Sequence, residues 1–137
     1  MYKERTQTQL RNWLSNKKSQ SKKKDFIVEF EPLTFFKWYL EQEKVCHYCG
    51  LNEKEQFQLI SKGHLNSKRF FTSNNGTRGK HLEIDRKNPL GPYSFENCVL
   101  SCYFCNNDKS DVFSEKEYIK VLNSSRVKFL RKLIRST

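Results

Sequence analysis

The sequence predicts an α+β fold with a small core of two short strands and flanking helices. The stretch 80–85 alternates apolar and polar residues, as a half-buried strand does, and 97–102 is predicted to be a second short strand. Three other stretches, 33–44, 114–122 and 124–135, carry apolar residues at helical spacing. Hydrophobic residues make up 36% of the chain and charged residues 30%, so one 137-residue domain with a modest core is expected. A core of this size needs an additional source of stability.

The N-terminal third predicts two helices and an extended segment. Residues 2–16 form the first predicted helix, with one apolar side made by Leu10, Trp13 and Leu14. Residues 15–24 are rich in Lys, Ser and Gln, which is typical of a mobile linker. Residues 25–30, DFIVEF, predict a short strand or an extended entry segment. Pro32 suits the first position of the second helix, whose apolar face would hold Phe35, Phe36, Tyr39 and Leu40.

The remaining elements follow in order. Residues 51–79 are polar and predict mostly loop, with a short helix around 53–60. Strand candidates 80–85 and 97–102 flank a loop at 87–94 that is rich in Pro and Gly. A helix begins within CYFCNNDKS, and Ser114 with Glu117 predicts a capping box that opens the next helix. The tail 124–135 predicts a basic helix with apolar spacing at Val127, Leu130 and Ile134.

The net charge of +11 is concentrated in two basic segments, 17–24 and 126–135. Such segments favour a polyanionic partner, most simply nucleic acid, although a solvated basic surface has the same composition. No run reaches the roughly 20 apolar residues of a membrane span. The N-terminal MYKERTQTQLRNW lacks the apolar segment of a signal peptide, so we expect a reducing, cytoplasmic setting.

Two cysteine pairs have the spacing of zinc knuckles. Cys46 and Cys49 form the first pair, and Cys102 and Cys105 form the second. A two-residue gap lets both thiolates of a pair reach one tetrahedral ion, and four thiolates make a closed, structural zinc site. The alternative is two unrelated buried pairs. Cys98 is an even number of positions from Cys102, so both side chains would point to the same face of a strand. Cys98 is therefore predicted to be a small buried core residue.

The stretch LEIDRKNPLGPYSFENCVLSCYFCNNDKSD, with the first cysteine pair before it, resembles the HNH endonucleases, also called ββα-metal or His-Me finger nucleases. The resemblance covers 46–113. It implies a zinc-stapled unit of two strands and a helix that presents a divalent cation, Mg²⁺ or Mn²⁺, to a scissile phosphate. It also implies a nuclease domain at 25–137, with core 46–113 and C-terminal basic helices at 114–135, after a basic helix and linker at 1–24.

The resemblance assigns roles to residues that match the motif. Asp85, at the end of the first strand, would bind the catalytic cation, and Asn106 would be its second ligand. Asn97 would brace the loop between the strands by hydrogen bonds. Ser110 or Asp111 could complete the cation's ligands. Carboxylate and amide oxygens suit a hard cation that keeps its waters and takes phosphate oxygens.

Arg86 departs from the family pattern, which has a histidine after the aspartate as general base. Arginine keeps its proton, so Arg86 cannot act as that base, but it can bind phosphate bidentately. His81 is the nearest imidazole and is one candidate base, and Tyr93 is another. Glu83 could bind metal, orient His81, or simply face solvent.

The sequence therefore predicts a metal-dependent endonuclease that hydrolyses DNA phosphodiester bonds. The alternatives are a catalytically impaired HNH-fold module that binds nucleic acid, and a zinc-stapled protein-interaction domain. The resemblance suggests a phage, restriction or homing context, without membrane association and as a monomer or homodimer. The expected DNA contacts are Arg86, Lys87, Lys109, Arg126, Lys128, Arg131 and Lys132.

Overall fold

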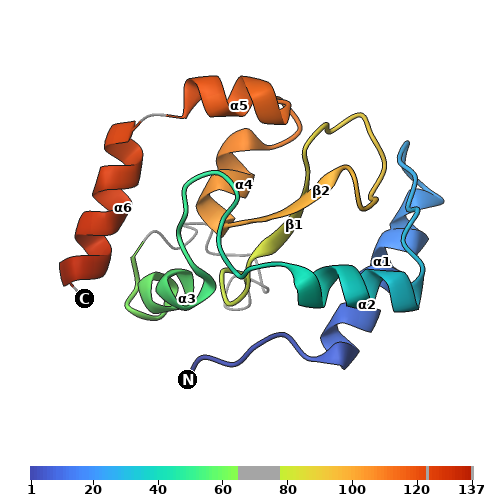
Figure 1. The fold of residues 1–137 in the computed structure, drawn as a ribbon, viewed down its shortest axis with the longest axis horizontal. Helices are drawn as coiled ribbons and strands as arrows, with labels where there is room; N and C mark the ends of the chain where they lie inside the picture. Colours follow the sequence, from blue (N-terminus) through green and yellow to red (C-terminus); the bar gives the residue numbers. More distant parts are fainter. Residues whose placement is uncertain (65–77, 123, 137) are drawn as a thin grey trace.

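A two-stranded antiparallel sheet lies at the centre of the computed structural model, which describes residues 1–64, 78–122 and 124–136 (Figure 1). Strand β1 (Glu83–Arg86) pairs with β2 (Cys98–Ser101), and Asp85 lies opposite Val99. Helix α4 (Tyr103–Lys109) follows β2 directly and packs against β1. This ββα unit confirms the predicted α+β class.

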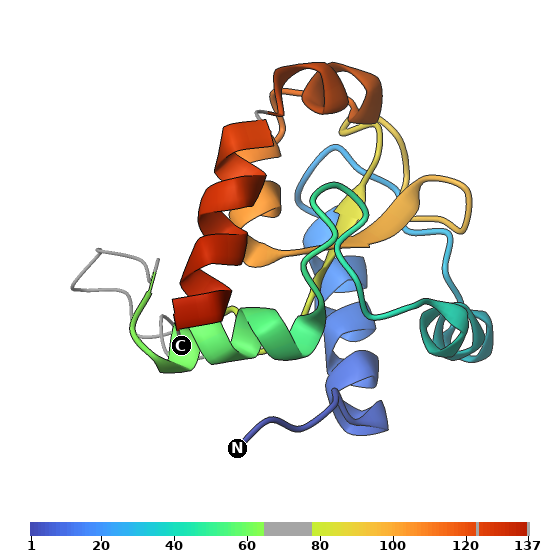
Figure 2. The same ribbon diagram turned by 60° about the vertical axis from the view of Figure 1, so that its left-hand side comes forward.

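The described residues surround this unit with five further helices (Figure 1). Helices α1 and α2 pack against each other, and α6 packs on α3, as the turned view also shows (Figure 2). Capping boxes at Thr6, Asn52 and Ser114 satisfy backbone N–H groups at three helix starts, which includes the predicted box of Ser114 with Glu117. The helices are α1 (Gln7–Ser21), α2 (Pro32–Glu41), α3 (Glu53–Ser61), α5 (Glu115–Val121) and α6 (Ser124–Ser136).

Helix α1 belongs to the main core, and the predicted linker at 15–24 is wrong as far as Ser21. Leu10 and Leu14 are buried in the same cluster as the aromatic residues of α2 and the apolar residues of the sheet. Lys and Gln are good helix formers. A segment with this composition can therefore form a helix when its apolar residues pack against the core and its polar residues face solvent.

Helix α2 confirms the predicted helix after Pro32 and most of its predicted apolar face, except that Trp38 is buried in place of Leu40. Phe35, Trp38 and Tyr39 are buried, whereas Leu40 is 76% exposed. Residues at positions 35, 38 and 39 lie on the side of the helix that faces the core. Leu40 lies next to this side and points toward solvent. Before α2, the extended segment 25–30 approaches the core through a bridge between Val28 and Tyr93.

Helix α3 occupies the position of the predicted short helix and buries polar side chains. Gln56 donates to the carbonyls of Gly79 and His81 at 2.8 and 2.9 Å and accepts from the amide of Tyr103. The Glu53 carboxylate accepts from the Leu82 amide at 3.1 Å. These bonds fix the entry to β1, which begins at Glu83. The rest of the predicted loop at 65–77 lies outside the described residues.

The described helices include none with the length and hydropathy that a membrane crossing needs.

Candidate active site

The four knuckle cysteines form one cluster, as the spacing predicts. Their sulfur atoms all lie within 4.8 Å of one another, and three of the four residues are buried. Cys102 is the N-cap of α4, whereas Cys46 and Cys49 lie on the turn that precedes α3. Hydrogen bonds within the cluster lower the pKa of Cys46 and of Cys49 and raise the pKa of Cys102, because the four thiol groups share their protons. A closed set of four sulfur ligands fits a structural metal such as zinc.

The first cysteine turn also connects to the end of β1. Tyr48, between the two cysteines, donates its hydroxyl to the Asp85 carboxylate at 2.8 Å. The amide of His47 donates to the Leu100 carbonyl at 2.9 Å, which ties the turn to β2. Nothing in the sequence pattern singles out Tyr48, because its role depends on packing across 37 positions. The cysteine cluster therefore lies one residue from a group that contacts the predicted catalytic acid.

Asp85 is buried at the base of the site and has two protein partners. Besides Tyr48, the ammonium of Lys109 lies 3.4 Å from its carboxylate and donates to the Arg86 carbonyl at 2.8 Å. Burial raises the pKa of Asp85, and the bonds from Tyr48 and Lys109 act against this. The Lys109 side chain is 1% exposed. It is therefore placed as an internal partner of Asp85, rather than at the surface where we expected it to meet a DNA phosphate.

Asn106 reaches the same face of the sheet from α4. Its side-chain amide donates to Glu83 at 3.1 Å, and Arg78 donates to both oxygens of Glu83 at 2.8 Å. Glu83 thus holds Asn106 and Arg78, and its described partners do not include His81. Within the described part of the chain, the Asn106 side-chain oxygen accepts no hydrogen bond. Asp85 and Asn106 line the same cleft, and a carboxylate and an amide oxygen are the types of ligand that suit Mg²⁺ or Mn²⁺.

Asn97 fixes the loop between the strands through three hydrogen bonds. It donates to the carbonyls of Asn88 and Pro92 at 3.0 and 2.9 Å and accepts from the Asn88 amide at 3.0 Å. Gly91 leaves room for this side chain, because a Cβ there would lie 2.7 Å from the Asn97 amide nitrogen. The loop is held in the manner predicted from Asn97.

His81 lies just before β1, outside the strand. Its Nε2 lies 2.9 Å from the Lys3 carbonyl oxygen. A carbonyl only accepts, so Nε2 carries the proton and Nδ1 is left as an acceptor. Burial lowers the pKa of His81. The imidazole is therefore neutral near neutral pH, which is the protonation state of a general base.

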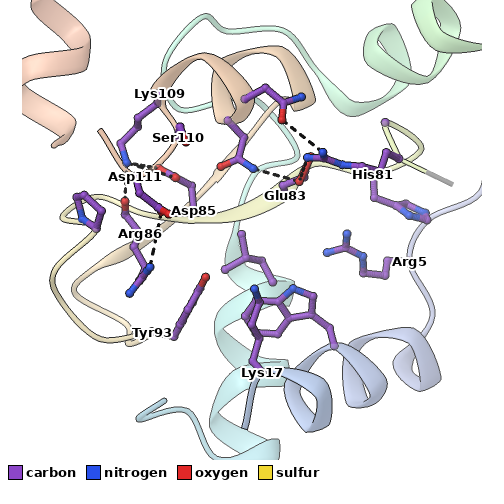
Figure 3. Close-up of a pocket in the computed structure, with 17 residues that line it drawn as sticks. Arg5, Lys17, His81, Glu83, Asp85, Arg86, Tyr93, Lys109, Ser110 and Asp111 are labelled. Atoms are coloured by element: carbon purple, nitrogen blue, oxygen red, sulfur yellow. Dashed lines mark hydrogen bonds and ion pairs between the residues drawn. The ribbon is translucent and has the colours of Figure 1, made fainter. Parts of the chain in front are cut away.

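The predicted site residues gather around a cleft of about 400 Å³ (Figure 3). One wall comes from β1, the following loop and α4, and the opposite wall comes from α1 and the N-terminal segment. The cleft brings together Asp85, Arg86, His81, Asn106, Lys109, Ser110 and Asp111, with Tyr93 among the further lining residues. It also contains Arg5 and Trp13, which the sequence pattern did not assign to the site, and Lys17, which belongs to the basic segment 17–24 that favours a polyanionic partner.

The predicted DNA contacts on α6 lie elsewhere. No α6 residue lines the cleft among the residues described, and Lys87 and Asn97 also lie outside the lining. Arg126 pairs with Asp108, and Arg131 pairs with Glu55 at 2.7 Å. Lys128 and Lys132 are exposed. Two of the four basic residues predicted on α6 are therefore used to pack the helix onto its neighbours.

The antiparallel strands, the following helix and the four-cysteine cluster together define the HNH type of nuclease fold. In particular, the structure is similar to that of the rare-cutting HNH restriction endonuclease PacI, which is described as perturbing DNA. The TM-score is 0.66 at 27% sequence identity, and the match covers 90% of this chain and 78% of that chain. No protein-family profile and no curated protein matches the chain.

Proposed function

We propose that this protein is a metal-dependent HNH-type endonuclease that hydrolyses DNA phosphodiester bonds. The observation that carries the proposal is the cleft itself, in which Asp85 and Asn106 share one pocket with basic side chains. The similarity to an HNH restriction endonuclease supports the same activity and the same substrate class. The net charge of +11 favours a polyanionic substrate.

Asp85 and Asn106 would hold the divalent cation. They supply oxygens from two elements, β1 and α4, and water and phosphate oxygens can fill the remaining positions, as is usual for Mg²⁺. The bound cation would polarise the scissile phosphate and stabilise the negative charge of the leaving 3′ oxygen. Lys109 and Tyr48 hold the Asp85 carboxylate in place by donating to it.

His81 is our candidate for the general base that takes a proton from the attacking water. Its Nε2 is engaged by the Lys3 carbonyl, which leaves Nδ1 to accept that proton. Tyr93 is the weaker candidate, because burial raises its pKa and keeps its hydroxyl protonated. Arg86 remains a phosphate ligand in this scheme.

A second function has a specific observation in its favour. Asp85 is already paired with Lys109 in a buried position, and Arg86 stands where the family has its catalytic histidine. A chain in which Lys109 kept the cation away would bind nucleic acid without cutting it. This is the catalytically impaired HNH-fold module.

Plasmid cleavage separates the two functions. The zinc-loaded chain is incubated with supercoiled DNA in the presence of Mg²⁺ or Mn²⁺, beside Asp85→Asn, Asn106→Ala and His81→Gln. Glu43→Gln is the control, because it makes the same carboxyl-to-amide change at an exposed position far from the lining. Cleavage by the parent and the control, with a loss in Asp85→Asn and Asn106→Ala, supports the nuclease. Tight binding without cleavage by the parent supports the binding module.

Metal analysis tests the cysteine cluster independently. We expect about one zinc per chain, because four thiolates complete one tetrahedral site. Cys102→Ser removes a buried ligand and should release the metal, whereas Cys98→Ser leaves all four ligands in place. Unchanged zinc content in Cys102→Ser would refute the assignment of the cluster.

A further inference from the structure

Three potential phosphate ligands from three segments meet at the Tyr93 ring. The guanidinium carbon of Arg86, on β1, lies 4.8 Å from the ring centroid. The ammonium of Lys17, on α1, lies 5.1 Å from the same centroid. Figure 3 shows the Tyr93 ring between these two side chains, with its hydroxyl end turned into the cleft. Two cations and a phenolic O–H therefore converge on one part of the cleft.

The charges of this group are poorly compensated by the protein. Among the described residues Lys17 has no ion pair, although its side chain is partly buried against the rings of Trp13 and Tyr93. The nearest carboxylate to Arg86 is that of Asp111, at 3.9 Å and on a side chain that is 89% exposed. Burial and the nearby Arg86 charge both lower the pKa of Lys17. An anion between the two cations would relieve this repulsion.

The Tyr93 hydroxyl faces the cleft and can donate to a bound ligand. Most of the Tyr93 residue is buried, with 8% of its surface exposed, and within the described ranges its hydroxyl makes no hydrogen bond to the protein. The hydroxyl is not among the described buried atoms that lack a partner, so it is open to solvent until a ligand binds. Its high pKa leaves it as a donor, and a donor that faces a cleft between two cations suits an anionic oxygen.

This group is distinct from the proposed cation site. In Figure 3 the Asp85 side chain points toward Lys109 on one side of β1, whereas Arg86 points to the other side, toward Tyr93. The alternation of side chains along a strand produces this separation. The Arg86 guanidinium is further held by a bond to the Gly91 carbonyl at 3.1 Å. It is thus positioned for a ligand beside the one that Asp85 and Asn106 would bind.

We propose that Lys17, Arg86 and the Tyr93 hydroxyl form a second phosphate site, which holds a non-scissile backbone phosphate of the bound nucleic-acid strand. The identity of the ligand rests on the proposed function, because the cation site would hold the scissile phosphate in the same cleft. Arg86 supplies a planar set of donors, Lys17 a point charge, and Tyr93 a neutral donor between them. Helix α1 thereby becomes a wall of the substrate cleft.

Binding measured without cleavage tests this site. Fluorescence anisotropy of a labelled duplex is recorded with the zinc-loaded chain in the absence of Mg²⁺, over a series of salt concentrations. Lys17→Met keeps the apolar stem on Trp13, and Lys18→Met makes the same change one residue on, where the lysine pairs with Glu31. Loss of one phosphate contact should weaken binding about eightfold at 0.1 M salt and lower the salt slope by about 0.9.

The outcomes are distinct from those of the cleavage experiment. A larger loss in Lys17→Met than in Lys18→Met supports the site even if the parent chain cuts no DNA. Tyr93→Phe should also weaken DNA binding. In the double variant Lys17→Met with Arg86→Gln, the fold-loss of DNA affinity should be smaller than the product of the two single fold-losses, because both groups share one ligand. Equal losses and equal salt slopes for Lys17→Met and Lys18→Met would overturn the proposal.

Two further measurements keep the test independent of any one variant. Inorganic phosphate, added at constant ionic strength, should lower DNA affinity more in the parent than in Lys17→Met, because it competes for the same site; equal displacement in both chains would contradict the site. In the unmutated chain, bound DNA should protect Lys17 from acetylation more than Lys18. Equal protection of the two lysines contradicts the proposed contact.

Discussion

Replacement of Lys109 by methionine should destabilise the fold more than any exposed lysine change. The Lys109 side chain is 1% exposed, and its ammonium is held by Asp85 and by the Arg86 carbonyl. Methionine has a similar length but leaves the Asp85 carboxylate with Tyr48 alone. Breaking a buried pair in this way costs roughly 3–5 kcal/mol. For a chain of this size that corresponds to a fall in Tm of about 10–17 °C.

The loss of stability caused by Lys109→Met should depend on pH. Burial raises the pKa of Asp85 in the folded chain, so ionisation of this group lowers stability as pH rises through that pKa. Lys109 opposes this shift, and Lys109→Met raises the folded pKa further. The stability difference between parent and variant should therefore be largest at neutral pH and smaller around pH 4, near the ordinary pKa of aspartic acid.

Thermal unfolding at fixed zinc concentration measures both effects, because bound metal itself shifts Tm. Lys120→Met is the control, since Lys120 is an exposed lysine on α5. The double variant Lys109→Met with Asp85→Leu should recover part of the loss, because it removes the unpaired charge. The reasoning is refuted if Lys109→Met lowers Tm no more than Lys120→Met at neutral pH.

Three further predictions concern the loop, the end of α4 and the fifth cysteine. Gly91→Ala places a Cβ 2.7 Å from the Asn97 amide, so it should lower Tm and DNA cleavage together, whereas an unchanged Tm would show that Asn97 can move aside. Ser110 has a φ of 51°, a conformation that glycine adopts more easily than serine. Ser110→Gly should therefore raise the free energy of unfolding by about 0.5–1 kcal/mol in denaturant titrations, and a lower free energy of unfolding would show that the serine side chain is needed. Cys98 is buried, which raises the pKa of its thiol to about 12. Mass spectrometry should therefore find it unalkylated by iodoacetamide in the native chain and modified after unfolding; rapid native alkylation would contradict its burial.

Local pattern was sufficient for the parts of the site whose signals lie close together in the sequence. Alternation located β1, a short apolar stretch located β2, and the two cysteine spacings located the metal cluster, because each signal depends on residues only a few positions apart. The resemblance to the HNH motif fixes the positions of Asp85 and Asn106 relative to the cysteines, and their roles as cation ligands stay a prediction. The structure places both residues in one cleft.

Lys109 shows why other parts were not predictable. A lysine in a polar stretch is expected at the surface, and its burial depends on a carboxylate 24 positions away. The same holds for Tyr48. Lys17 belongs to a basic segment that favours a polyanionic partner, but the linker-like composition of that segment did not indicate that a helix, α1, would line the cleft. These roles arise from packing between elements, which neither composition nor periodicity records.

The cysteine cluster has a consequence for the unfolded chain. Residues 50 to 101 form a loop of 52 residues between the two cysteine pairs, and both Asp85 and Asn97 lie within it. Closure of a loop of this length removes about 4 kcal/mol of chain entropy, by the relation used for disulfides. A metal that joins the ends of the loop must supply this free energy. With zinc as the bound metal, we expect its supply during folding to set how many chains acquire an ordered cleft, although the ion would contact no DNA in the proposed reaction.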